Sequence, residues 1–193
     1  VDAEEPTLRS RRASLVDGII RMPDRFEGIA AETAGPLFQA AMAHVGAHIA
    51  YGLPRFTIGK LKPTQIILVS LIEDARVEQL AVRRFPGLRQ VWAPFHVARA
   101  DGPLLAPLLL TRLSRALFDP DYVDSDGWVD KGRRLFADAQ ARLEDPAVAR
   151  DIGSLLGNDL GQMRLRLDTD AYVVEPAYRD DNMGLWAWPD DAD

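Results

Sequence analysis

The stretch PLFQAAMAHVGAHIAY, from Pro36 to Tyr51, decides how the chain is expected to fold. It contains no charged residue, and its apolar side chains recur at helical spacing. Pro36 suits the first turn of a helix, and Gly52 suits the position just beyond its end. A helix without charges is normally buried on most of its sides. The stretch therefore predicts a largely buried helix.

Helical spacing of apolar residues continues along most of the chain. Further helices are predicted at residues 8–20, 25–33, 63–85, 88–95, 103–118, 128–143 and 146–166. Residues 171–175 have the composition of a strand, and we expect there either one short strand or an extended arm. We therefore predict an all-α, multi-helix bundle, with a helical domain over residues 1–168 and an acidic arm over residues 169–193.

Composition narrows the classes of function. The formal net charge of −6 argues against nucleic acid or an anionic membrane surface as a partner. The chain has no cysteine, which excludes disulfides, thiolate nucleophiles and cysteine-based metal sites. The apolar run from Leu104 to Leu110 is too short to span a bilayer, and no signal peptide is visible. We expect a cytoplasmic protein with no membrane insertion.

Two histidines on the charge-free helix are candidate metal ligands. His44 and His48 are four residues apart, which puts both imidazoles on one face of the helix. Glu73, on the helix predicted from Pro63, projects among apolar side chains, where a carboxylate needs a partner or a metal. We therefore predict His44, His48 and Glu73 as metal ligands, with zinc as the candidate ion.

These residues permit two interpretations. The histidines could be core residues that hydrogen-bond to a carboxylate such as Glu73, with Asp74 and Glu78 on another side of that helix, facing water or nearby arginines. Alternatively they hold a metal, as in zinc peptidases with a His-Glu-x-x-His helix completed by a later Glu. In those enzymes the residue after the first His is a Glu that acts as general base, whereas here it is Val45. We therefore expect no catalytic activity.

Two late tryptophans are candidate partner-binding residues. Trp186 and Trp188 lie in an acidic stretch with no clear helical or strand pattern. If they are exposed, they are suited to anchor a partner protein. If they fold back, they close the hydrophobic core, and the sequence leaves both possibilities open.

Six stretches of the chain together resemble one protein family. They are HVGAHIAYG (44–52), LKPTQ (61–65), VSLIEDARVE (69–78), RFPGL (84–88), LGNDLG (156–161) and VEPAYRDDN (174–182). They are similar to the helical N-terminal part of the NorD/CbbO activators, which include the nitric-oxide-reductase activation protein and the Rubisco activation protein. A cobaltochelatase subunit is a more distant similarity. The resemblance covers nearly the whole chain.

The resemblance implies a function as well as a fold. Such activators carry a C-terminal von Willebrand A domain and act with a ring-shaped MoxR-type AAA+ ATPase, which supplies the work. The 169–193 arm is then expected to lead to a von Willebrand A domain that is missing here. The implied function is an adaptor that couples the ATPase to a target such as Rubisco or nitric oxide reductase, without catalysis of its own. The alternative is a degenerate zinc-metallopeptidase-like domain that retains a structural metal.

Overall fold

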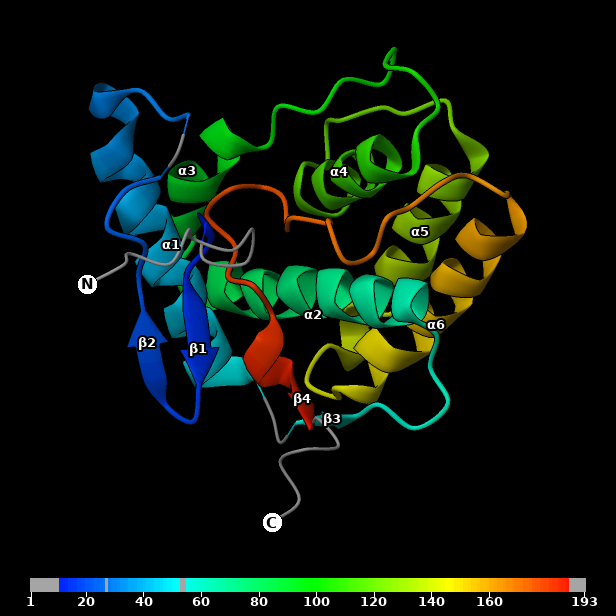
Figure 1. Cartoon of the computed structure of the whole chain (residues 1–193), viewed down its shortest axis with the longest axis horizontal. Helices are drawn as coiled ribbons and strands as arrows, with labels where there is room; N and C mark the ends of the chain where they lie inside the picture. The colour runs from blue at the N-terminus through cyan, green and yellow to red at the C-terminus, as the bar shows by residue number, and fades with distance from the viewer. Residues whose placement is uncertain (1–10, 27, 53–54, 188–193) are drawn as a thin grey trace, which may run out of the picture.

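The computed structural model describes residues 11–26, 28–52 and 55–187, and the chain is mostly helical over these residues (Figure 1). Its helices are α1 (Ala31–Tyr51), α2 (Pro63–Arg84), α3 (Leu88–Trp92), α4 (Ala106–Phe118), α5 (Gly127–Asp138) and α6 (Ala147–Gln162). The prediction of a mainly helical protein is confirmed. Within the described residues, no helix is both long and apolar enough to cross a membrane.

Helix α2 runs through the middle of the molecule, with α1 on one side and α5 and α6 on the other (Figure 1). Every residue from Leu68 to Glu78 is buried, including charged residues such as Asp74 and Arg76. A helix that is surrounded on all sides has no single apolar face. The apolar neighbours of a charged residue in α2 therefore do not tell which way its side chain points.

Helices α2 and α6 approach each other closely because α6 carries glycine at the contact. A Cβ atom on Gly153 would overlap the backbone of Val69, and one on Gly157 would lie 2.7 Å from the Cα atom of Gln65. Distances below 3.0 Å are not tolerated by backbone atoms. The two glycines thus set the spacing of the helix pair at the centre of the core.

The predicted helix over residues 8–20 is wrong where the structure describes it. The chain there forms an antiparallel hairpin of β1 (Ser14–Val16) and β2 (Ile19–Arg21), in which Leu15 lies opposite Ile20. The turn is Asp17-Gly18, with φ values of 52° and 74°. Asp-Gly is a preferred pair for a two-residue hairpin turn, which requires positive φ at both positions. That turn signal outweighs the helical spacing around it.

Helix α1 differs from the prediction in its start and in its burial. It begins at Ala31, so of the predicted 25–33 helix only the last residues are helical. One of its faces is buried, but Phe38, Met42 and Ile49 are 47%, 38% and 62% exposed. The lack of charge over residues 36–51 therefore reflects an uncharged exposed face as well as a buried one.

Residues 169–193 were predicted to form an acidic arm. The structure describes this stretch as far as residue 187, and residues 169–187 pack against the helices. It runs back across the molecule from the end of α6 (Figure 1). Residues 171–175 form neither a helix nor a strand. Tyr178, Arg179 and Asp180 are all buried, at most 2% exposed. Residues 178–180 of this segment are therefore part of the core.

The end of this segment forms β4 (Trp186–Ala187), which pairs in parallel with β3 (Phe56–Thr57). Trp186 is 1% exposed, and its indole Nε1 donates a hydrogen bond to Ser70 Oγ at 2.9 Å. Trp186 therefore closes the core, which is the second of the two possibilities that the sequence left open, and its side chain is not exposed to a partner. Trp188 lies outside the described residues.

Candidate metal centre

Helix α1 presents His44 and His48 on its buried face, one turn apart. The two ring centroids are 4.7 Å apart, and the ring planes are inclined at 84°. His44 is 0% exposed and His48 is 5% exposed. Two imidazoles at positions i and i+4 point to the same side of a helix, so the predicted pairing of these residues is confirmed.

Two aspartates complete the group. Asp74 comes from α2, and Asp180 comes from the 169–187 segment. Asp74 Oδ1 lies 3.1 Å from His48 Nε2 and 3.7 Å from His44 Nε2. Asp180 Oδ1 lies 3.2 Å from His44 Nε2 and 3.6 Å from His48 Nε2. One ligand atom from each of the four residues lies within 4.8 Å of the other three, so this buried group could hold a metal ion.

The spacing of these atoms suits a small tetrahedral cation. Zinc binds imidazole nitrogen and carboxylate oxygen at about 2.0–2.2 Å, so two ligand atoms of a tetrahedral zinc ion are separated by roughly 3.3–3.6 Å. The four imidazole–carboxylate distances range from 3.1 to 3.7 Å. These four separations are thus close to those expected between the ligands of a tetrahedral ion.

The structure does not bring Glu73 to the histidines. Both of its carboxylate oxygens accept hydrogen bonds from Arg76, each at 2.7 Å. Arg76 also donates to the carbonyl oxygens of Leu143 and Tyr51. Glu73 thus belongs to a buried ion pair on another side of α2, and the prediction of Glu73 as the acidic ligand is corrected to Asp74. The two side chains diverge because neighbouring helix positions are about 100° apart.

Glu78 and Arg179 form the layer behind the imidazoles. Glu78 Oε1 lies 3.0 Å from His44 Nδ1, although the ring N–H is not aligned along this contact as a hydrogen bond. Arg179 binds Glu78 through two hydrogen bonds of 3.0 and 2.8 Å, and it donates a third to Ser114 Oγ at 3.2 Å. A carboxylate behind a metal-binding histidine is the usual arrangement in metalloproteins.

The buried charges leave room for a cation. Three carboxylates, on Asp74, Glu78 and Asp180, face the single guanidinium of Arg179, so the group carries a formal charge of −2 when both imidazoles are neutral. Burial lowers the pKa of His44, but the neighbouring carboxylates of Asp180 and Glu78 outweigh it and raise that pKa to about 9. A proton on His44 therefore supplies part of the missing positive charge, and a metal ion would compete with that proton.

Asn182 holds both carboxylate ligands in place. Its side-chain Nδ2 donates to Asp74 Oδ2 at 3.1 Å, and its backbone N–H donates to Asp180 Oδ2 at 3.3 Å. Its φ of 60° lies in the left-handed region, which asparagine tolerates better than most residues. Only the amide nitrogen can donate to a carboxylate, so the amide oxygen points elsewhere. That oxygen is buried and has no hydrogen-bond partner among the described residues.

Sequence reasoning missed Asp74, Glu78, Arg179 and Asp180 as parts of the site. One signal could have found the first two, because Asp74 and Glu78 have the same i, i+4 spacing as the two histidines. No local spacing could have found Asp180, which is 136 positions from His44. The run Glu-Pro-Ala-Tyr-Arg-Asp-Asp-Asn was noted only for its resemblance to a family.

The comparisons with known proteins add no relative. No family model matches the chain, and no curated protein or solved structure gives a significant match. The assignment of function therefore depends on the geometry of the site.

Proposed function

We propose that this chain is a metal-binding domain in which one divalent cation joins α1, α2 and the 169–187 segment. The observation that supports it is the spacing of His44, His48, Asp74 and Asp180, whose imidazole–carboxylate distances of 3.1–3.7 Å are close to those around a tetrahedral ion. The charge of the group supports it too, since a divalent cation brings the formal charge of −2 to zero.

Zinc fits this donor set best. Two imidazole nitrogens and two carboxylate oxygens are common zinc ligands, and all four come from the protein, as in structural zinc sites. The position where zinc peptidases carry a general base is Val45, which is fully buried and cannot transfer a proton. The proposed role of the metal is therefore structural or regulatory, as in a degenerate peptidase-like domain, rather than hydrolytic.

The test is elemental analysis of the purified chain after zinc loading and desalting, beside the His44→Ala, His48→Ala double variant. We expect about one zinc per chain in the parent and none in the double variant. His96→Phe is the matched control, because this histidine is buried outside the group and its removal should leave the zinc content unchanged. Chelation should lower the thermal midpoint of the parent and of the control, but not of the double variant.

Two outcomes contradict the proposal. One is a parent chain that remains free of metal after loading. The other is a double variant that retains the full zinc content, which would place the ion elsewhere.

We propose as a second candidate the adaptor function, with α1 docking on a MoxR-type AAA+ ATPase. The observation that favours it is the uncharged exposed face of α1, which carries Phe38, Met42 and Ile49. Contiguous exposed apolar residues often mark a surface for a partner protein. The same helix carries the metal ligands on its other face, so metal binding would hold this surface in one orientation. Rubisco or nitric oxide reductase remains the proposed class of target.

A purified MoxR-type ATPase provides the test of this second function. We expect the chain to co-elute with the ATPase ring in the presence of nucleotide, and the Phe38→Asp, Met42→Asp variant to lose that binding. Val123→Asp serves as control, because Val123 is 75% exposed on a loop apart from α1. Equal binding by the parent and the α1 variant would exclude this face as the docking surface.

A further inference from the structure

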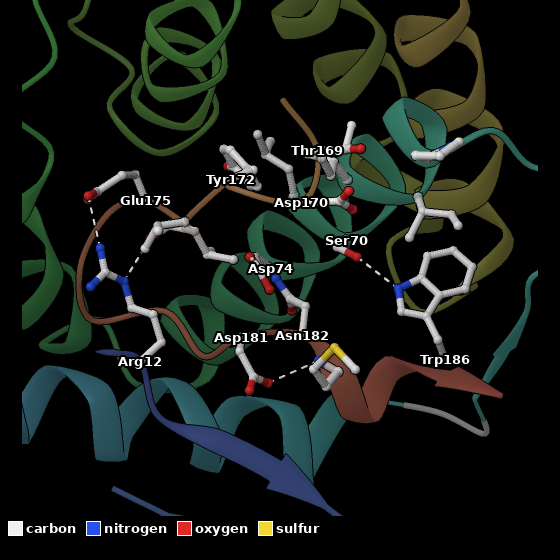
Figure 2. Close-up of a pocket in the computed structure, with 17 residues that line it drawn as sticks. Arg12, Ser70, Asp74, Thr169, Asp170, Tyr172, Glu175, Asp181, Asn182 and Trp186 are labelled. Atoms are coloured by element: carbon white, nitrogen blue, oxygen red, sulfur yellow. Dashed lines mark hydrogen bonds and ion pairs between the residues drawn. The ribbon is translucent and has the colours of Figure 1, made fainter. Parts of the chain in front are cut away.

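A pocket of about 260 Å³ lies between α2 and the 169–187 segment (Figure 2). Much of its lining is apolar, with Ile66, Ile67 and Leu71 from α2 facing Val173, Val174 and Trp186 from the segment. Pockets of this kind bind small molecules or single side chains through apolar walls and a few polar groups. The polar groups therefore decide what the pocket can take.

The charged groups of the lining are mostly anionic, beside the hydroxyl groups of Ser70, Thr169 and Tyr172. Four carboxylates, on Asp74, Asp170, Glu175 and Asp181, stand against one guanidinium, on Arg12, which gives the described lining a formal charge of −3. Figure 2 shows these carboxylates distributed along the pocket, with Asp74 and Asn182 near its middle. An anionic ligand is disfavoured by such a lining, and a cationic one is favoured.

Arg12 is held at the rim of the pocket by hydrogen bonds within the protein. Its Nε donates to the carbonyl oxygen of Val174 at 2.8 Å, and its Nη2 pairs with Glu175 Oε1 at 2.9 Å. Arg12 thereby shows how this rim holds a cation, with one backbone carbonyl and one carboxylate. A third hydrogen bond, from Arg12 Nη1 to the carbonyl oxygen of Arg11 at 3.2 Å, also holds the guanidinium at the rim.

An unsatisfied acceptor lies beside the pocket, where neighbouring atoms cover it. Asn182 lines the pocket, is only 5% exposed, and its amide oxygen has no donor among the described residues. Its amide nitrogen is held by Asp74, which also lines the pocket and is fully buried. A buried acceptor without a donor costs free energy, and a ligand that brings an N–H group recovers it.

We propose that this pocket binds a primary ammonium group carried on a short apolar chain. The ammonium lies on the side of Asp74 and Asn182, where it donates to the amide oxygen after a small side-chain shift, and the apolar chain lies between Ile67 and Trp186. The same chemistry occurs in a free alkylamine and in a lysine side chain. This binding site goes beyond the metal function: it shares Asp74 with the proposed metal group, but its apolar walls and its amide acceptor are present without a metal.

The test is calorimetric titration of the full chain with three probes of similar size: 2-phenylethylamine, 2-phenylethanol and 3-phenylpropionate. We expect the amine to bind at least about tenfold more tightly than the alcohol, and the carboxylate not to bind. Nα-acetyl-lysine amide distinguishes the source, since stronger binding of this probe than of the amine assigns the pocket to a peptide side chain. Equal affinity for amine and alcohol, or no binding of either, overturns the proposal.

Variants locate the binding. Val173→Trp fills the pocket and should abolish amine binding, whereas Val123→Trp adds the same side chain to an exposed loop and should leave it unchanged. Arg12→Ala removes the cation at the rim and should tighten amine binding several-fold. This variant tests the location of the amine if Val173→Trp fails to fold. Unchanged affinity in a folded Val173→Trp variant, or weaker binding in Arg12→Ala, overturns the proposal. Titrations of zinc-loaded and chelated chain keep this result separate from the metal content.

Discussion

Glu78 Oε1 lies 3.0 Å from Nδ1 of His44, while the other ring nitrogen, Nε2, faces Asp180 at 3.2 Å. A carboxylate in this place fixes the orientation of the ring and makes it a stronger ligand. Burial raises the pKa of Glu78, but Arg179 and His44 outweigh it and hold that pKa well below its usual range, so the carboxylate stays charged. The relationship links metal affinity to a residue that is not itself a ligand.

The first prediction follows from this contact. Glu78→Gln should weaken zinc binding about 10–100-fold, because the neutral amide no longer supports the imidazole. Glu73→Gln is the matched control, since Glu73 pairs with Arg76 on another side of the same helix. Competition with a chromophoric chelator measures both affinities. Equal affinities in the two variants would show that Glu78 has no part in the site.

The second prediction concerns Arg179. Its replacement by leucine leaves Glu78 buried without its cation, which should lower the free energy of unfolding of the metal-free chain by about 3–5 kcal/mol. Arg99→Leu should change stability little, because the Arg99–Asp101 pair is fully exposed. Urea denaturation of both variants compares them. A small loss in Arg179→Leu would mean that the 169–187 segment contributes little to the core.

The third prediction concerns the contact between α2 and α6. Gly153→Ala should destabilise the protein by about 1–3 kcal/mol, because the added methyl group overlaps the backbone of Val69. Gly161→Ala, in the same helix but with open space around it, should instead be neutral or stabilising by up to about 1 kcal/mol. Thermal unfolding of the pair gives the comparison. Equal changes in stability in the two variants would contradict the close approach of α2 and α6 at Gly153.

The fourth prediction concerns acid. His96 is buried, and burial together with the charge of Arg179 lowers its pKa to about 3. The unfolded chain therefore binds a proton near pH 6.5 that the folded chain does not, and stability falls as pH decreases from 6.5 towards 3. This residue should account for a loss of about 2 kcal/mol between pH 7 and pH 5.

The control for this effect is His96→Phe, which can keep the stacking on Phe118, where the ring centroids are 4.3 Å apart. The variant should lose less stability than the parent over the same pH range, as measured by urea denaturation at each pH. Parallel losses in the two proteins would assign the acid sensitivity to other groups.

Local sequence signals predicted the long helices well. For α2 these signals are Pro63 at its start and the Pro86-Gly87 turn after its end. They predicted a helix over residues 63–85, and the observed helix is Pro63–Arg84. Helical spacing gave a wrong prediction for residues 8–20, where the structure describes a β-hairpin. The two-residue Asp17-Gly18 turn is a stronger constraint there than the apolar pattern around it.

The site could be predicted only in part. The i, i+4 spacing of His44 and His48 is a local property, and the structure keeps it. The choice between Glu73 and Asp74 depends on which neighbour covers each side of α2, and that is a property of the whole core. Asp180 reaches the site through a segment without regular structure, for which spacing carries no directional information.

The place of Asp180 in the chain has a consequence for how the protein is made. During synthesis from the N-terminus, α1 to α6 leave the ribosome before residues 178–182 do. Until then Asp74 and Glu78 lack both Arg179 and the partners that the last residues bring. A nascent chain stalled before residue 178 therefore exposes an incomplete core in which Asp74 and Glu78 have only the α1 histidines as partners. Chaperones or proteases should recognise such a chain as unfinished.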